Sequence, residues 1–324
     1  MKQVKLFFAT TSLAVCLVIT NSCSQTTTTP ANSSNPVVFK ATTLCGDDVK
    51  SLLQIPADTK CEMMKWNLTL FQDPKTSAPG EYKLIYEYGL AKQGTRDFME
   101  GSKTTELKGK WTIGNGTKEN DKAVIYTLEA GSSLVSLSFL KPDQNILRLL
   151  DQDKNLMIGN GAWSYTLNNV NPIPASTVKF SLQPDSAPRI ETDSVIVGVF
   201  DGRTPCSNDL LELNGISAAG CQIIKCRLTL YQDTITHTPT TFQIYTVYVG
   251  KGDTRYSNTG KWKMFKGTKI DPEAIVYLLE PDSGKPHSLV LLKADNNILF
   301  FLDENMNQLV GDGYSSYTLN RAKK

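Results

Sequence analysis

Residues 136–168 read SLSFLKPDQNILRLLDQDKNLMIGNGAWSYTLN, and residues 288–320 read SLVLLKADNNILFFLDENMNQLVGDGYSSYTLN. More than half of the positions in these two stretches are identical. Two further pairs extend the match toward the amino terminus: 61–73 (CEMMKWNLTLFQD) with 221–233 (CQIIKCRLTLYQD), and 123–129 (AVIYTLE) with 274–280 (AIVYLLE). Several motifs in the same order indicate a tandem duplication of one domain.

Within each copy, apolar residues follow a period of two rather than the helical period of 3.6. In the first copy this pattern, rich in β-branched and aromatic residues, predicts strands over 67–70, 82–86, 124–128 and 164–167. Polar turn sequences separate the apolar runs, which number roughly eight per copy. We therefore expect an all-β protein of two antiparallel up-and-down barrels, since closure removes exposed strand edges. A β-sandwich is the alternative.

One short helix is expected after the first cysteine of each copy, over 47–53 and 207–211, because capping residues begin both segments. Between the copies, a segment with four prolines predicts an extended linker. The predicted organisation is a signal peptide over 1–22, a tether over 23–35, a first barrel over 36–169, a linker over 170–194 and a second barrel over 195–321.

The amino terminus carries an export pattern. Its first 22 residues, MKQVKLFFATTSLAVCLVITNS, place two lysines before an apolar run, which predicts a secretory signal peptide. A transmembrane anchor is the alternative, but the run is shorter than the about 20 residues that a membrane span needs. Cys23 stands where a bacterial lipoprotein is diacylated, so we expect a lipid anchor there. Cys16 is the competing site, and we expect it to leave with the signal peptide.

Four cysteines form two couples at equivalent places in the repeat: Cys45 with Cys61, and Cys206 with Cys221. In an oxidising compartment these couples predict one structural disulfide in each domain. A metal or redox role is the alternative, but a metal site would need more ligands near each couple, and the chain has only two histidines. Cys226 takes the place of a tryptophan of the first copy, which predicts a buried free thiol. The alternative is a Cu(I) ligand together with Met264 or Met306.

Charge and motifs exclude several classes of function. The chain has 34 basic and 32 acidic residues, so it lacks the basic footprint of a nucleic-acid-binding protein. It contains none of the common hydrolase, metalloprotease, phosphate-loop or dinucleotide motifs. The two copies share no histidine. Their shared aspartates fall mainly in predicted turns, and their shared aromatic residues are expected in the barrel cores. We expect no catalytic residues and assign no metal ligands.

One set of motifs resembles a known family. The segment FDGRTPC at 200–206 precedes an LTLYQD strand, a GKW motif and a closing SYTLN, and this order resembles the NlpE-type lipoproteins, a family named for copper resistance. The resemblance implies lipocalin-like barrels on an outer-membrane lipoprotein, with links to copper homeostasis and envelope stress. The family often has Cys-x-x-Cys after the proline, whereas here Ser207-Asn208-Asp209 follows Cys206. A second barrel also replaces the different carboxy-terminal domain of the sensor member.

The resemblance and the residues together predict a non-enzymatic lipoprotein of the bacterial envelope, on the periplasmic face of the outer membrane. Its expected partners are the membrane, through the lipid, and either an envelope protein or a small apolar ligand. Two alternative functions remain: a lipocalin-like carrier of such a ligand, and an adhesion or interaction module. An open apolar lumen would favour the carrier, and a lumen filled with side chains would favour interaction. No cofactor is expected, with copper as a possible ligand.

Overall fold

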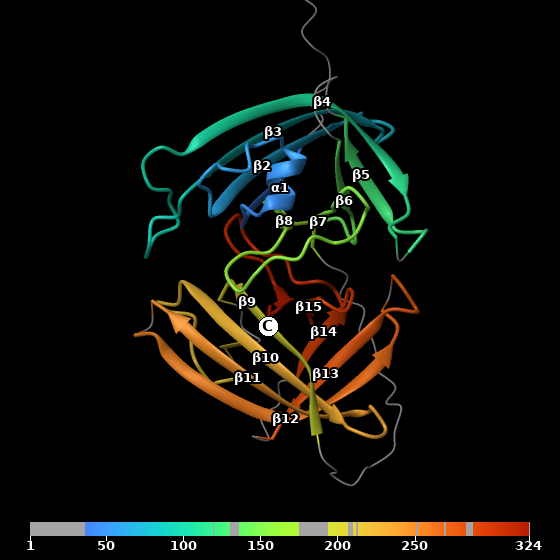
Figure 1. The fold of residues 1–324 in the computed structure, drawn as a ribbon. Coiled ribbons are helices and arrows are strands. Elements are labelled where there is room, and N and C mark those ends of the chain that lie inside the picture. The colour runs from blue at the N-terminus through green and yellow to red at the C-terminus, as the bar shows by residue number, and fades with distance from the viewer. Residues whose placement is uncertain are drawn as a thin grey trace, which may run out of the picture. The chain divides into compact units, whose positions relative to one another are not determined.

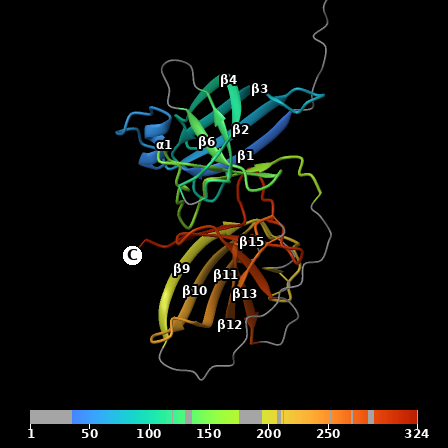
Figure 2. The same cartoon turned by 90° about the vertical axis from the view of Figure 1, so that its right-hand side faces the viewer.

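Both repeats fold as closed antiparallel barrels (Figures 1 and 2). The structure is a computed structural model, and it describes residues 36–118, 120–129, 136–174, 194–206, 210–211, 213–250, 252–268, 270–282 and 288–323. The predicted signal peptide, Cys23, the tether and most of the predicted linker lie outside the described residues. Residues 34–324 belong to one unit of the chain.

The first barrel, called barrel 1, is a simple meander in which each strand pairs with the next and the last pairs with the first. Its strands are β1 (Val37–Leu44), β2 (Met63–Gln72), β3 (Pro79–Gly89), β4 (Lys103–Asn115), β5 (Val124–Leu128), β6 (Leu137–Leu140), β7 (Ile146–Leu149) and β8 (Thr166–Asn169). At the closure, Phe39 lies opposite Asn169 and Lys40 opposite Asn168. Closure leaves neither β1 nor β8 as a free edge.

The second barrel, called barrel 2, repeats this topology. Its strands are β9 (Ser194–Thr204), β10 (Ile223–Asp233), β11 (Pro239–Val249), β12 (Thr254–Lys266), β13 (Ile275–Pro281), β14 (Leu289–Lys293), β15 (Ile298–Leu302) and β16 (Thr318–Arg321). It closes between β9 and β16, where Asp201 lies opposite Asn320. The predicted all-β fold of two eight-stranded barrels is confirmed. All four predicted strands are present, and the last begins at Thr166 rather than Ser164.

The predicted helix of the first copy is α1 (Asp47–Leu52), with two aspartates in its first turn. Acidic residues are favourable there because the helix dipole is positive at that end. Val49 and Leu52 turn inward and are buried. In the second copy the corresponding segment falls partly outside the described residues, and Leu210 and Leu211, which are described, are helical and buried.

Side chains fill the interior of each barrel. In barrel 1 the buried cluster includes Trp66, Tyr82 and Trp111, and in barrel 2 it includes Phe242, Tyr248 and Trp262, each joined by many leucines. The indole N–H of Trp111 donates to the carbonyl of Phe71 at 2.9 Å, and that of Trp262 donates to the carbonyl of Tyr231 at 2.7 Å. The shared aromatic residues therefore serve as core, as expected from the sequence.

Candidate functional site

The motif SYTLN, identical in both copies, positions the most distinctive polar site of the molecule. It occupies Ser164–Asn168, which leads into β8, and Ser316–Asn320, which leads into β16. Successive side chains of an extended chain point to opposite sides, so its tyrosine and leucine turn into the barrel core. Its serine, threonine and asparagine turn outward, yet all six of these side chains are buried. They are buried because the two barrels cover each other at this place, which we call the seam.

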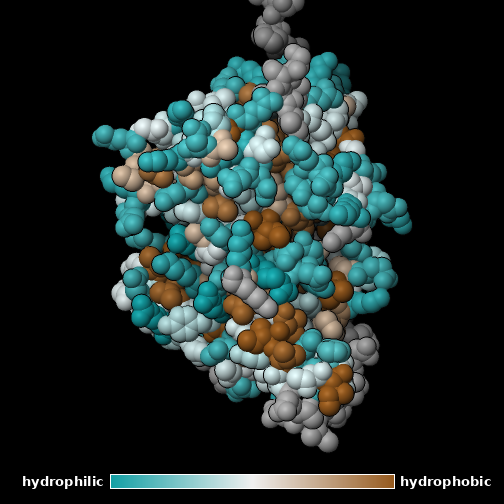
Figure 3. All heavy atoms as spheres, in the orientation of Figure 1, coloured by the Kyte–Doolittle hydropathy of each residue, from teal (hydrophilic) through white to brown (hydrophobic). Residues whose placement is uncertain are grey.

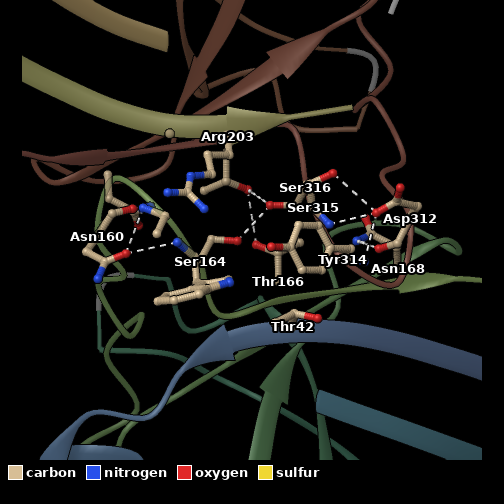
Figure 4. A pocket seen from close by; sticks show the side chains of 15 residues that line it. Thr42, Asn160, Ser164, Thr166, Asn168, Arg203, Asp312, Tyr314, Ser315 and Ser316 are labelled. Atoms are coloured by element: carbon tan, nitrogen blue, oxygen red, sulfur yellow. Dashed lines mark hydrogen bonds between the residues drawn. The ribbon is translucent and has the colours of Figure 1, made fainter. Parts of the chain in front are cut away.

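Equivalent residues of the two barrels meet across the seam (Figure 4). The hydroxyls of Ser164 and Ser316 share a hydrogen bond of 2.6 Å, and those of Thr166 and Thr318 share one of 3.1 Å. A residue can contact its own equivalent only near a two-fold axis that relates the two copies. The seam therefore has the form of an isologous interface within one chain.

The last residue of each motif, Asn168 or Asn320, forms hydrogen bonds to the backbone of the other barrel, and we call each of these pairs of bonds a clamp. The Oδ1 of Asn168 accepts from the N–H of Gly311 at 2.8 Å, and its Nδ2 donates to the carbonyl of Asp312 at 2.9 Å. In the reverse direction, the Oδ1 of Asn320 accepts from the N–H of Gly159 at 2.9 Å. Its Nδ2 donates to the carbonyl of Asn160 at 3.2 Å. Each amide thus satisfies a donor and an acceptor of the opposite backbone, which would otherwise be costly to bury.

Glycine permits close approach beside these clamps. A Cβ added to Gly161 would lie 3.1 Å from the Cβ of Asp201, and one added to Gly313 would lie 3.2 Å from the Cβ of Lys40. Gly161 and Gly313 are equivalent, and so are Lys40 and Asp201. The hydroxyl of Thr42 also donates to the carbonyl of Gly313 at 3.0 Å.

Arg148 and Phe300 are also equivalent, but they differ in chemistry. The Arg148 guanidinium stacks over the Phe300 ring and donates from Nη2 to the Oε1 of Gln308. Burial lowers the pKa of the Arg148 guanidinium well below its ordinary value, and the Asp143 carboxylate opposes that shift. The Nε of Arg148 is buried with no hydrogen-bond partner among the described residues. This pair makes the seam asymmetric at one position.

A loop of barrel 1 adds a second asymmetric contact. The first copy has nine more residues between Tyr88 and Trp111 than the second copy has between the equivalent Tyr248 and Trp262. Within them, Arg96 stacks over the ring of Tyr314 and lies 3.6 Å from a carboxylate oxygen of Asp312. It also donates to the carbonyl of Gln222 at 3.1 Å. The insertion therefore contacts barrel 2.

The cavities near these residues are small or shallow. At the seam, a polar cavity of about 10 Å³ is lined by residues such as Thr166, Thr318 and Arg203, and this volume is at the limit for one water molecule. A second pocket, of about 380 Å³, lies beside Tyr88 of barrel 1 and is lined by Pro56, Asp58, Thr59, Lys60, Gly89, Gly101 and Lys103.

The predicted disulfides are present. Cys45 bonds to Cys61 with a Cα–Cα distance of 5.7 Å, and Cys206 bonds to Cys221 with one of 6.1 Å. Cys23, the predicted lipid site, lies outside the described residues. Each disulfide joins the chain just after the first strand of a barrel to the chain just before the second, across the helical segment.

The free thiol of Cys226 is buried in the core of barrel 2, as predicted. Burial raises the pKa of this thiol to about 12. Met306 belongs to a different buried cluster, and Met264 is exposed. The structure therefore does not assemble Cys226 with either methionine into the copper site considered from the sequence. Among the described residues, no group of three or more His, Cys, Asp or Glu side chains is placed to hold a metal ion.

The shared aspartates serve the turns, as expected. Asp73 Oδ1 accepts from the N–H groups of Lys75 and Thr76, and Asp233 Oδ1 does the same for Ile235 and Thr236. Asp143, Asp295, Asp151 and Asp303 likewise accept from backbone N–H groups within their own turns. They do not converge on one site.

Two closed barrels with equivalent contacts define a duplicated antiparallel-barrel protein. Residues 216–312, within barrel 2, match the family model of the NlpE N-terminal domain. This match covers less than a third of the chain, and the two equivalent barrels are consistent with two tandem copies of that domain. Comparison with curated proteins and with solved structures gave no match.

No helix in the described part of the chain is both long and apolar enough to cross a lipid bilayer.

Proposed function

We propose that this protein is a lipid-anchored protein of the outer membrane, held on the periplasmic side through Cys23, that acts without catalysis by binding other envelope proteins. Its physiological role would be a response to envelope stress of the copper-homeostasis type, as its NlpE domain suggests. The observation that carries the proposal is that side chains fill the interior of both barrels. A filled barrel presents only its outer surface to a partner.

A carrier of a small apolar ligand needs an open apolar cavity, commonly of about 300 Å³ or more. The places that such a ligand would take are occupied by large side chains, among them Trp66, Trp111, Tyr248 and Trp262. The 380 Å³ pocket of barrel 1 is lined partly by Asp58, Lys60 and Lys103, which do not suit an apolar ligand. The packing therefore favours interaction over transport.

The link to copper is proposed to be regulatory. Cu(I) binds thiolates, and the raised pKa of Cys226 keeps its sulfur protonated at neutral pH. The other described cysteines are held in disulfides. We infer that copper stress reaches the protein through other envelope components and that the barrels themselves do not store the metal.

The outer surface offers apolar contacts to a partner. Figure 3 shows hydrophobic residues gathered in separate patches on a mostly hydrophilic face. The exposed large apolar side chains include Ile235 and Ile270, which are 80% and 76% exposed, and the equivalent residues Ile113 and Met264. Scattered apolar residues are ordinary on protein surfaces, so these positions support interaction only together with the filled interiors.

A complementation experiment tests the proposal. In a deletion strain of the source bacterium, we expect the wild-type gene to restore an envelope-stress reporter and copper tolerance. Cys23→Ser should release the protein from the membrane and abolish both responses. Cys16→Ala is the matched control and should behave as wild type. Full activity of Cys23→Ser, or a deletion with no effect on either readout, would contradict the proposal.

Native mass spectrometry of the protein purified from envelopes separates the alternatives. We expect the mass of the acylated chain with two disulfides and no further ligand. A stoichiometric lipid would support the carrier function instead. Copper retained against a chelator would contradict the regulatory interpretation.

A further inference from the structure

We propose that the seam is an isologous docking surface whose occupant can be a barrel of a second copy of this chain. In particular, a second copy of barrel 2 can take the place that barrel 1 holds on barrel 2. The inference concerns assembly and stands apart from the proposed function.

The first argument is that the contacts are reciprocal. Ser164 meets Ser316 and Thr166 meets Thr318, so a barrel 2 in the place of barrel 1 would present the same hydroxyls. An interface of this form is self-complementary, since each patch supplies what the opposite patch needs. The faces need no adaptation at these positions.

The second argument is that the clamps are the same in both directions and recognise backbone atoms. Asn168 binds the backbone of Gly311 and Asp312, and Asn320 binds the backbone of Gly159 and Asn160. The difference between Asn160 and Asp312 therefore does not matter to either clamp. In a pair of two barrels 2, Asn320 of each copy would clamp the backbone at 311–312 of the other.

The third argument is that Arg148 and Phe300 determine which barrels can pair with each other. In a pair of two barrels 2, two Phe300 rings would meet, an arrangement that aromatic side chains accept. In a pair of two barrels 1, two Arg148 guanidinium groups would meet at a position that is 4% exposed. Like charges that are buried together disfavour association strongly. The permitted pairs are therefore barrel 1 with barrel 2, and barrel 2 with barrel 2.

The fourth argument is that each barrel is complete without the other. Each has a closed sheet, its own buried cluster and its own disulfide. Separation at the seam therefore exposes a docking face without unfolding either barrel. The covalent connection only raises the effective concentration of the partner barrel. A membrane that concentrates these chains would favour exchange between them.

The test compares separate barrels by sedimentation velocity. We expect residues 194–324 to form a dimer, residues 36–174 to remain monomeric, and an equimolar mixture to form the one-to-one complex. Asn320→Ala should weaken the barrel 2 dimer by about tenfold or more, because each copy loses two buried hydrogen bonds. Gln243→Ala, which removes an exposed amide on β11, is the matched control and should change nothing.

Substitutions at Arg148 and Phe300 test which barrels can pair with each other. Phe300→Arg should abolish the barrel 2 dimer, and Arg148→Phe should allow barrel 1 to pair with itself. Circular dichroism and the disulfide content establish that each variant is folded. A folded barrel 2 that stays monomeric where the mixture forms its complex would overturn the proposal. So would a barrel 2 dimer that is indifferent to both Asn320→Ala and Phe300→Arg, since it would use another surface.

The full chain provides the remaining measurement. Two populations of the complete protein, labelled with donor and acceptor dyes, should develop energy transfer at high concentration as barrels exchange. The paired variant Asn168→Ala with Asn320→Ala should abolish the transfer. Transfer that persists unchanged in that variant would exclude the seam as its origin.

Discussion

The two barrels fill the same region of their interiors in different ways. In barrel 1, Trp66 lies 6.1 Å from Tyr86, and Tyr86 lies 6.1 Å from Tyr88, between ring centroids. In barrel 2, Cys226 and Thr246 replace the first two of these aromatic residues. Barrel 2 has a polar network beside Thr246, in which the Nδ2 of Asn214 donates to the Tyr248 hydroxyl at 2.7 Å.

That network is completed by neighbours on other elements. Tyr248 donates to the carbonyl of Leu210 at 2.7 Å, and Asn258 donates to the Oδ1 of Asn214 at 2.8 Å. A buried interior thus tolerates either solution, provided that its volume is filled and its polar groups are paired. The seam differs between the copies at Arg148 and Phe300, but both copies keep the serine, threonine and asparagine of SYTLN.

The largest expected effect concerns the core tryptophans. Trp111→Ala should destabilise barrel 1 by about 3–5 kcal/mol, because it leaves a cavity and an unpaired carbonyl at Phe71. Trp262→Ala should do the same to barrel 2, where the indole bonds to Tyr231. Urea unfolding followed by hydrogen exchange and mass spectrometry resolves the two barrels. Equal losses of stability in both barrels from one variant would show that they unfold as one unit.

The disulfides should have the next largest effect. Replacing Cys45 and Cys61 by serine should cost barrel 1 about 3 kcal/mol. The Cys206 and Cys221 replacement should cost barrel 2 nearly the same, because the sequence separations are 16 and 15. Thermal unfolding of the variants measures this. Markedly unequal losses would mean that the partly polar interior of barrel 2 depends more on its disulfide.

Exchanging the interior residues tests the comparison directly. Cys226→Trp should destabilise barrel 2 by about 1–3 kcal/mol, because a much larger side chain must enter a buried position of a packed core. Cys226→Ala is the control and should cost less. Urea midpoints of the isolated barrel give the values. A stabilised Cys226→Trp would mean that barrel 2 contains space for the larger ring.

The smallest expected effect depends on pH. Hydrogen bonds from the Thr76 backbone, the Thr76 hydroxyl and the Lys75 backbone lower the pKa of Asp73 below its ordinary value of 3.8. A lowered pKa in the folded state stabilises barrel 1 above the ordinary pKa, and this contribution is lost as the pH falls through the folded-state pKa.

Asp73→Asn should therefore reduce the loss of thermal stability on acidification. Melting temperatures at neutral and acid pH provide the measurement. An unchanged acid dependence in the Asp73 variant would contradict the assignment.

Much of the fold follows from the sequence, because its signals are local or repeated. Period-two alternation identifies strands, and the duplicated motifs place equivalent elements in both copies. The cysteine couples are paired correctly because each stands at the same place in the repeat. Cys226 is buried as predicted, since it takes the position of Trp66 in the first copy.

The seam could not be predicted in the same way. Ser164, Thr166 and Asn168 alternate with apolar residues, as the solvent-facing side of a strand normally does. Only the docking of one barrel on the other buries them. One signal was present: SYTLN is identical in both copies on its outward side as well as on its inward side. Identity on an outward polar side indicates contact, whereas packing alone would explain only the tyrosine and leucine.

The Arg148 and Phe300 pair also shows what gene duplication makes possible. In an assembly of identical subunits, every mutation at the axis appears twice, so an arginine there would face another arginine. Once two copies are encoded in one reading frame, each can mutate alone. In this chain the Arg148 guanidinium lies over the Phe300 ring, whereas a symmetric dimer would place two identical side chains together at this position. Fusion of two copies into one chain therefore permits substitutions at the centre of such an interface that identical subunits could not accommodate.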